Sequence, residues 1–406
     1  MLHCCKAAIC WLLSGISLLL PLGRWLPEKA CQPGLFNRYC ISYTSEVRLQ
    51  GEFTYYIGCK EITETFYLEA AAEPTEFRSF IDGFLDGRLA ARAGELVLVS
   101  LDGDGEYEIE SIALERVKPP KDTHLLLEDA WCQVGVSLQW GGALDMFVWK
   151  AAPAGFGNLI NRADAGRLLQ QSYYGTDELP YVAGEWAGTP WLYNPVQGGD
   201  SYGNCSKIVD YARQENQIYI KCRPMDWSKN GEPPPAYMEN TYTLENGILT
   251  IDNRFTDFSG YAHPARPQEM PACYVVSALD TFNFYDGAAP WTDAALTRKS
   301  DLPFWGGAPE CVFNLNPVNT ETWCAWTQGA QPDAFGVSVY VPGTETLLAG
   351  RSDSKVTFDP NASATSYVAA VRTLRMTAEP FEYTYYLTAG TLSQMRGAWL
   401  ERQQSM

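Results

Sequence analysis

Histidine and basic residues are scarce in this chain of 406 residues, and long helix-forming runs are almost absent. The sequence has only 3 His, and its 30 Lys and Arg face 48 Asp and Glu, which gives a formal net charge of −18. Nucleic-acid binding requires a patch of Lys and Arg, and no cluster of basic residues occurs, so we expect no nucleic-acid partner. The acidity also disfavours a polyanionic substrate, because like charges repel.

Several signatures of catalysis and cofactor binding are missing as well. The sequence contains no Gly-x-Ser-x-Gly elbow, no phosphate-binding loop and no dinucleotide fingerprint. It has no Cys-x-x-Cys motif, and so few histidines leave little room for a metal site. We therefore expect neither a cofactor nor a metal. The 12 Cys are scattered, several within strand-like runs, which favours core positions over a disulfide framework.

The N-terminal residues are typical of a targeting segment. Lys6 precedes an apolar run at 7–22, which Pro21 interrupts and Arg24 follows. The run is short for a membrane-spanning helix and suits the core of a signal peptide. We therefore expect a secreted or cell-envelope protein with no stable membrane insertion beyond this leader. No good cleavage site follows, and a mis-assigned start codon is the alternative explanation of the segment.

Short runs that alternate polar and apolar residues predict antiparallel β-structure through most of the chain. Two such runs flank Gly58, and two more flank Asn246-Gly247, the preferred pair for a type I′ hairpin turn. Runs 94–101 and 107–114 are predicted to pair with each other. Many strands separated by turn signals, without intervening helices, indicate a mainly β fold built as an antiparallel sandwich.

Turn-rich stretches divide the chain into four segments. The Pro119-Pro120 pair favours a linker after a small β domain. A C-terminal helix is predicted, which Thr391 or Ser393 can cap. Its apolar side would carry Leu392, Met395, Trp399 and Leu400. The predicted segments are a leader at 1–34, a small β domain at 35–120, a large β domain at 121–390 and the helix at 391–406.

The densest set of polar groups is found in segment 260–271, where His263, Arg266, Gln268 and Glu269 alternate with prolines that stiffen the backbone. Glu269 could act as a general base or nucleophile, and His263 as a general acid, on a glycosidic or hemiacetal oxygen. Arg266 could keep Glu269 ionised or bind a substrate carboxylate. A structural ion pair between Arg266 and Glu269, with a capping histidine, would explain the same residues.

Three further segments combine aromatic rings with amide or acid groups, as sugar binding requires. They are 166–175, 186–204 and 282–291, and each could instead be an ordinary strand, a self-packed loop or core. The candidate catalytic residues of the whole chain are Glu269, His263, Asp200 and Glu239. The candidate substrate-binding residues are Arg167, Gln171, Tyr174, Trp191, Gln197, Arg266, Gln268 and Trp291.

From about residue 135 to residue 390, the sequence resembles the galactose mutarotase-like superfamily of carbohydrate-active proteins. The resemblance rests on the series of strands, the aromatic loops 186–202 and 282–291, and the cluster from His263 to Glu269. The run 166–174 is also similar to a motif of uncharacterised secreted bacterial proteins of this type. The resemblance implies a β-supersandwich, a domain that several glycoside hydrolases and polysaccharide lyases carry. Mutarotases use a histidine acid and a glutamate base, which His263 and Glu269 match in residue type only.

Three functions fit these observations. The leading hypothesis is a glycoside hydrolase acting on a poly- or oligosaccharide, with Glu269 and either Asp200 or Glu239 as the carboxylate pair. The second is a polysaccharide lyase, in which Arg266 and Gln268 neutralise a uronate while a tyrosine or histidine takes a proton. The third is a non-catalytic glycan-binding protein. The partner is a carbohydrate in each case, and the oligomeric state is left open.

Overall fold

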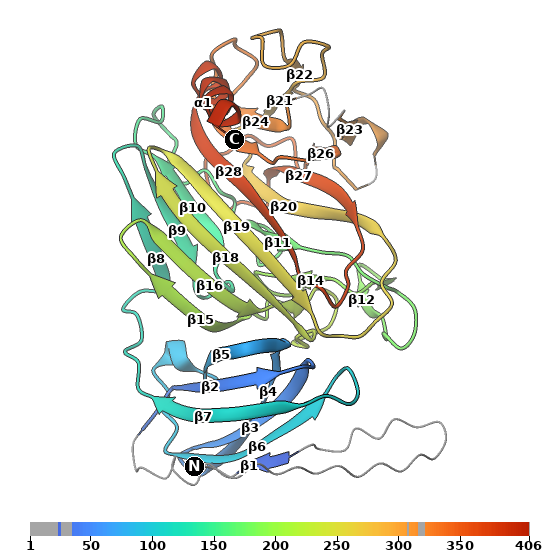
Figure 1. Cartoon of the computed structure of the whole chain (residues 1–406). Coiled ribbons are helices and arrows are strands. Elements are labelled where there is room, and N and C mark those ends of the chain that lie inside the picture. The colour runs from blue at the N-terminus through green and yellow to red at the C-terminus, as the bar shows by residue number, and fades with distance from the viewer. Residues whose placement is uncertain (1–22, 26–34, 307, 316–320, 406) are drawn as a thin grey trace. The chain divides into compact units, whose positions relative to one another are not determined.

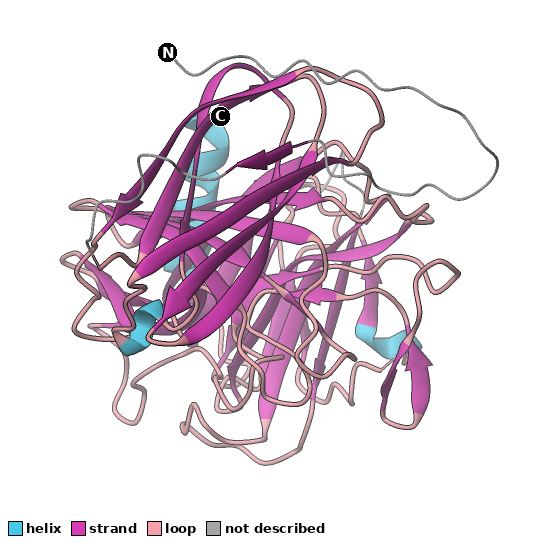
Figure 2. Ribbon diagram, turned by 90° about the horizontal axis from the view of Figure 1, so that it is seen from below, coloured by secondary structure: helices cyan, strands magenta, loops and turns pink. Residues whose placement is uncertain are grey.

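The structure is a computed structural model that describes residues 23–25, 35–306, 308–315 and 321–405. These residues form two compact units that divide between Lys121 and Asp122. Figure 2 shows that strands dominate and that helical residues are confined to short stretches. The predicted fold class is confirmed: the sheets are antiparallel, the N-terminal β region is the smaller one, and a short helix ends the chain. Most of the predicted leader lies outside the described residues.

The N-terminal unit consists of two antiparallel sheets around an aromatic core. One sheet has the order β1 (Gly23–Trp25), β6 (Arg92–Ser100), β3 (Leu49–Ile57) and β4 (Lys60–Leu68). The other has the order β5 (Ala71–Phe80), β2 (Arg38–Ser45) and β7 (Tyr107–Glu115), and a short 3₁₀ turn follows β5 at Phe84–Asp86. The rings of Tyr39 and Phe53 lie 4.6 Å apart, and those of Phe66 and Phe77 stack at 5.2 Å. Burial of such large rings stabilises a unit of this size.

The hairpin at Gly58 is confirmed, since β3 pairs with β4 over its full length. The predicted pairing of 94–101 with 107–114 is wrong. Strand β6 pairs with β3, whereas β7 pairs with β2 in the other sheet. The turn between them crosses from sheet to sheet, and Asp102 there accepts a hydrogen bond from the Arg48 guanidinium at 2.6 Å. Alternation fixes the face of a residue but does not fix its partner strand.

The C-terminal unit is built on two large antiparallel sheets (Figure 1). The ten-stranded sheet follows the path β23 (Val312–Asn314), β26 (Thr346–Arg351), β27 (Thr365–Leu374), β20 (Arg266–Val276), β11 (Leu169–Ser172), β10 (Ala143–Trp149), β9 (Cys132–Ser137) and β8 (His124–Glu128). Two short strands extend it beside β11, β14 (Pro195–Val196) and β17 (Met225–Asp226).

The nine-stranded sheet runs β15 (Lys207–Arg213), β16 (Gln217–Arg223), β18 (Ala236–Glu245), β19 (Ile248–Asp257), β28 (Phe381–Thr391), β25 (Phe335–Tyr340), β24 (Trp323–Thr327), β21 (Thr281–Phe284) and β22 (Thr297–Lys299). A separate hairpin consists of β12 (Gly184–Trp186) and β13 (Thr189–Trp191). A 3₁₀ turn at Pro309–Cys311 precedes β23. As the pattern predicted, Asn246 and Gly247 form a tight turn with positive φ values of 52° and 75° between β18 and β19.

Buried amide side chains join the two large sheets. The Gln171 Nε2 of β11 donates to the Asn240 Oδ1 of β18 at 3.1 Å, and the Gln197 Nε2 donates to the same oxygen at 2.8 Å. Tyr173 packs edge-on against Phe255 of β19, with centroids 4.8 Å apart. The residues on the inner face of β11 therefore form the contact between the two sheets. The residues that alternate with them along β11 lie on its outer face.

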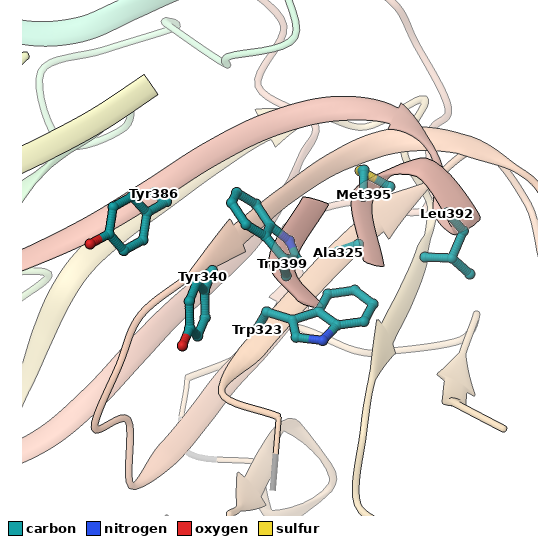
Figure 3. Close-up of a cluster of buried hydrophobic side chains, with 7 residues drawn as sticks. All are labelled: Trp323, Ala325, Tyr340, Tyr386, Leu392, Met395 and Trp399. Carbon is teal, nitrogen blue, oxygen red and sulfur yellow. The ribbon is translucent and has the colours of Figure 1, made fainter. Parts of the chain in front are cut away.

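The C-terminal helix α1 (Leu392–Ser405) packs against β24, β25 and β28. Figure 3 shows its buried residues meeting the sheet in a cluster of Trp323, Ala325, Tyr340, Tyr386, Leu392, Met395 and Trp399. Thr391 caps the helix: its Oγ1 accepts from the Gln394 N–H at 3.4 Å, while the Gln394 Oε1 accepts from the Thr391 N–H at 2.9 Å. This reciprocal pair is a capping box, and it bears out Thr391 as the cap.

The cysteines that the structure describes are all free thiols, and most are buried. Burial raises the pKa of the Cys273 thiol to about 12, as expected for a thiol used as core. Among the described residues, no helix combines the length and the apolar character needed to cross a membrane.

Candidate active site

The structure places Glu269 on the outer face of the ten-stranded sheet, away from the contact with the other sheet. On β20 it lies opposite Ser172 of β11 and Val371 of β27. Its carboxylate accepts a hydrogen bond from the Tyr367 hydroxyl of β27. The residue as a whole is half-buried. We call Glu269, Ser172, Tyr174, Tyr274 and Tyr367 the glutamate–tyrosine site.

A β-bulge brings Tyr274 to the same face as Glu269. These residues are five apart, an odd spacing that places side chains on opposite faces of a regular strand. The register between β20 and β27 shifts between Glu269 and Ala272, which inserts one extra residue. Tyr274 then lies opposite Tyr367, and their ring centroids are 4.7 Å apart.

The electrostatics of this site favour protonated groups. Burial raises the pKa of Glu269, while hydrogen bonds from Tyr367, Tyr174 and Ser172 lower it in part, and the balance is upward. Burial and the nearby Glu269 charge hold the pKa of Tyr174 and Tyr367 well above the ordinary value. The phenols therefore keep their protons and act as donors, and Glu269 is the group suited to exchange a proton.

Aromatic side chains border the site on the β26 side. The Trp305 ring lies 4.6 Å from Tyr367 and 4.6 Å from Phe304, which is 55% exposed. Trp305 rests over Gly350 of β26, where an added Cβ would come within 2.9 Å of the Trp305 backbone nitrogen. A larger residue at 350 would collide with the backbone that carries Trp305, so the glycine permits the close approach of this segment.

Arg167 and Asp164 lie near the Tyr274 end of the site. Burial and the Glu269 charge raise the pKa of Tyr274, the Asp164 charge adds to this rise, and the Arg167 charge opposes it. Arg167 pairs with Asp164 at 3.2 Å and donates to the Ser363 carbonyl. The predicted sugar ligand Arg167 is therefore close to the site but already engaged in fixing its own loop.

Gln268 and Arg266 do not share the surroundings of Glu269. Gln268 points to the opposite face of the sheet and is fully buried. Its side-chain amide forms two hydrogen bonds with the main chain of Tyr174: the Oε1 accepts from the Tyr174 N–H at 2.7 Å, and the Nε2 donates to the Tyr174 C=O at 2.9 Å. Gln268 thus positions Tyr174. Arg266 pairs with Asp177 at 2.8 Å, not with Glu269. The predicted ion pair between Arg266 and Glu269 is absent from the salt bridges of the described residues.

His263 is sealed in the interior. Its side chain has no exposed surface, its Nδ1 accepts from the Thr176 N–H at 3.0 Å, and its Nε2 lies 3.2 Å from the Asp257 carboxylate. Since Nδ1 accepts a hydrogen bond, the ring proton is on Nε2, and the Nε2–H donates to Asp257. Tyr193 donates to the same carboxylate at 2.8 Å. With both ring nitrogens bonded and no access for substrate, this geometry does not suit the predicted general acid.

The other two predicted catalytic acids lie apart from Glu269. Asp200 is 1% exposed and accepts from the backbone N–H groups of Tyr202, Asn204 and Gly231, at 2.9, 2.9 and 2.7 Å, so it holds a turn together. Glu239 is on β18 in the other large sheet. Neither forms the expected pair with Glu269.

Glu239 lines a separate polar cavity of about 420 Å³ on the nine-stranded sheet. Burial alone would raise the pKa of Glu239, but the Lys221 and Arg254 charges and a hydrogen bond from Tyr219 outweigh it and lower the pKa. Arg254 lies 3.0 Å from Glu239 and 3.1 Å from Glu382. The Glu239 carboxylate is therefore ionised and balanced by neighbouring positive charges, so it is not suited to donate a proton.

The remaining predicted sugar ligands are divided. Gln171 and Gln197 belong to the buried amide network and have no exposed surface. Trp291 contacts Tyr340 next to the α1 cluster, with centroids 6.0 Å apart. Trp191 is linked to the site: its indole N–H donates to Asn194 at 3.0 Å, and the Asn194 amide donates to the Ser172 hydroxyl at 3.4 Å. Of the predicted residues, Glu269, Tyr174, Arg167 and Trp191 are brought together.

The sequence prediction missed Tyr274 and Tyr367. The bulge hides Tyr274 from the alternation rule, and Tyr367 lies almost a hundred residues away from Glu269 in the chain, with no local signal. In the part of the chain that the structure describes, His, Cys, Asp and Glu side chains form no group of 3 or more suited to a metal ion. The site thus combines a carboxyl group of raised pKa with phenols and aromatic faces, an arrangement suited to proton transfer.

A fold of this class occurs in solved structures. The chain is similar to a galactose mutarotase related enzyme from Lactobacillus acidophilus (11% identity, 66% of this chain and 97% of that chain, TM-score 0.40). A galactose mutarotase-like protein from Lactobacillus casei is similar as well (13% identity, 66% and 99%, TM-score 0.38). An alpha-mannosidase from Enterococcus faecalis matches over 93% of this chain and 41% of its own (10% identity, TM-score 0.38).

The first two are proteins of the type that the sequence resembles. No protein-family model matches the chain, and no curated protein matches it in sequence. At these identities the likeness concerns the fold, and no residue role is carried over from these proteins.

Proposed function

We propose that this protein is a carbohydrate-active enzyme in which Glu269 transfers the proton. One observation carries the proposal: the Glu269 carboxyl group, whose pKa burial raises, lies on the outer face of the ten-stranded sheet among aromatic rings, on a residue that is half-buried as a whole. Sugars stack their C–H faces on such rings while their hydroxyls bond to polar groups. A carboxyl group of raised pKa is the kind of acid that protonates a glycosidic oxygen.

The reaction class we propose is glycoside hydrolysis. Glu269 protonates the leaving oxygen, and Tyr367 and Tyr174 stabilise the carboxylate that forms by donating hydrogen bonds to it. A water molecule attacks the anomeric carbon as the leaving oxygen departs, and a second carboxylate takes the proton of that water. We assign this role to Asp164 in place of Asp200 or Glu239, because the Asp164 side chain is 54% exposed and its charge acts on Tyr274 of the site. Lyase chemistry by a tyrosine base is disfavoured, since the raised pKa of the phenols keeps them neutral.

The second candidate function is glycan binding without turnover. This function is favoured because Glu269 already accepts hydrogen bonds from several donors. Such bonds hold the carboxylate in place as an acceptor for sugar hydroxyls, as a binding site requires. The two candidates predict different effects of removing the carboxylate.

The test is the isosteric variant Glu269→Gln, which keeps an acceptor and removes the proton. Turnover is measured as new reducing ends from a panel of neutral polysaccharides, with the melting temperature and carbohydrate affinity measured in parallel. We expect turnover to disappear while affinity and melting temperature stay close to wild type. Glu382→Gln, at an exposed carboxylate of the other sheet, is the control. Full turnover in Glu269→Gln would refute the role of Glu269.

A further inference from the structure

Two aromatic platforms flank Glu269. The first, Phe304 and Trp305, rests on β26 and β27. The second is formed by Trp186, Trp191 and Trp227, around the β12–β13 hairpin. In the second platform, Trp186 meets Trp191 at 4.7 Å and Trp227 at 6.0 Å, and 39% of Trp186 is exposed.

The order of strands places these platforms on opposite sides of the carboxylate. Neighbouring strands lie about 4.8 Å apart, and Glu269 is on β20 between β27 and β11. Trp305 covers Gly350 on β26, two strands away from β20 in one direction. The hairpin platform is tied to Ser172 on β11, one strand away in the other direction.

The hairpin platform is held in place by directed bonds. Trp191 donates to Asn194, and Asn194 donates to Ser172, which in turn lowers the pKa of Glu269 by hydrogen bonding. On the other flank of the platform, Trp227 packs over Gly166, where an added Cβ would lie 2.3 Å from the indole ring. Gly166 directly precedes Arg167 of the loop near Tyr274. The platform is thus attached to the site at two points.

We propose that the site accommodates an oligosaccharide that spans Glu269, with one sugar ring on the Trp305 platform and another on the Trp186 platform. This inference rests on the proposed function and names its substrate class. The bond between the two rings lies over the Glu269 carboxyl group, so attack occurs within a chain rather than on a free monosaccharide. Stacking on both sides gives the longer ligand its affinity.

The charges around the hairpin platform indicate a neutral sugar. Glu185 lies within the hairpin and the exposed Glu178 precedes it, while the neighbouring Asp177 is already paired with Arg266. The nearby cation Arg167 is paired with Asp164. An anionic sugar would meet repulsion here without a free counter-charge at Arg167.

The test measures dissociation constants of Glu269→Gln for ladders of gluco-, galacto- and manno-configured oligosaccharides, from monosaccharide to hexasaccharide. Glu269→Gln prevents turnover during titration, and tryptophan fluorescence reports binding. We expect affinity to rise by about tenfold between the monosaccharide and a longer ligand of one ladder, the factor that about 1.4 kcal/mol represents. In the same background, Trp186→Ala and Trp305→Ala should each remove this gain.

Trp131→Ala is the matched control, because Trp131 is 51% exposed and stacks on Trp149 at the β8–β9 edge, away from both platforms. It should retain the gain with length. Equal affinity for monosaccharide and longer ligands overturns the inference but leaves the proposed function intact. Full turnover by Glu269→Gln on the same ladders refutes the proposed function instead. Binding to none of the ladders overturns the inference outright.

Discussion

The Tyr367 hydroxyl donates to the Glu269 carboxylate across two neighbouring strands, β27 and β20. This bond stabilises the ionised form and so lowers the pKa of a carboxyl group that burial has raised. Tyr367 therefore sets the pH at which Glu269 gives up its proton, and it does so from a position that no local sequence motif reveals.

Replacement of Tyr367 by Phe should shift the pH dependence of turnover. The variant loses the donor, so the pKa of Glu269 rises and the alkaline limb of the rate profile moves to higher pH. The measurement is the rate at limiting substrate from pH 4 to 9. Tyr274→Phe, which removes a hydroxyl from the same ring pair, should shift that limb less. An unchanged limb in Tyr367→Phe would show that Glu269 does not control it.

His263→Ala should weaken the fold rather than alter the pH profile. The change leaves the buried Thr176 N–H without its acceptor, at about 1–3 kcal/mol, and removes one of the donors to the Asp257 carboxylate, which keeps those from Tyr193 and Ser259. Urea denaturation measures the loss, and the rate per folded molecule is followed alongside. A stable variant with a severe loss of turnover would restore His263 to the catalytic role that the sequence suggested.

Asp226 should make stability depend on pH. Burial raises its pKa from 3.8 to about 6, against a hydrogen bond from Tyr181 at 2.9 Å. Since the folded pKa exceeds the unfolded one, its contribution is present below pH 4 and is lost as pH rises toward 6. A shift of this size represents about 3 kcal/mol.

The variant Asp226→Asn should be more stable than wild type above pH 6, with a flatter stability curve between pH 4 and pH 6. Thermal unfolding across this range measures both effects. Asp104→Asn, on the exposed turn between β6 and β7, is the control. An identical slope in Asp226→Asn and wild type would exclude a titration of Asp226 in this window.

Trp399→Ala should destabilise the C-terminal unit by about 3–5 kcal/mol, the usual cost of deleting a large buried ring. Trp399 is fully buried in the cluster of Figure 3, and its indole N–H donates to Ser338 at 2.7 Å. Leu400→Ala, at the neighbouring half-buried position, should cost clearly less. Equal losses of melting temperature in the two variants would mean that the cluster does not anchor α1.

Local signals in the sequence predicted the elements that depend on neighbouring residues. Asn246-Gly247 specifies its hairpin because both positions need positive φ, and Thr391 specifies the start of α1 by capping. The arrangement of residues around Glu269, in contrast, depends on strand pairing between distant parts of the chain. Adjacent residues of a strand point to opposite faces, which separates Gln268 from Glu269, and the bulge after Glu269 reverses the alternation for Tyr274.

Composition alone could not separate buried polar groups from exposed ones. Gln171 and Gln197 have the chemistry of sugar ligands, yet they lie between the sheets because Asn240 offers them a shared partner. That partner belongs to a strand far along the chain, and its proximity follows from topology. The sequence selected Glu269 and Tyr174, which the fold brings together, but it assigned His263 and Asp200 to a surface that they do not reach.

The amides between the large sheets have a consequence for motion. Apolar contacts are not directional, so on their own they would let one sheet slide over the other at little cost. The hydrogen bonds from Gln171 and Gln197 to a single oxygen of Asn240 are directional, and they break when the sheets shift relative to each other. These bonds resist sliding, so the sheet that carries Glu269 stays fixed relative to the other large sheet. Any adjustment to an arriving ligand then falls to the loops above it.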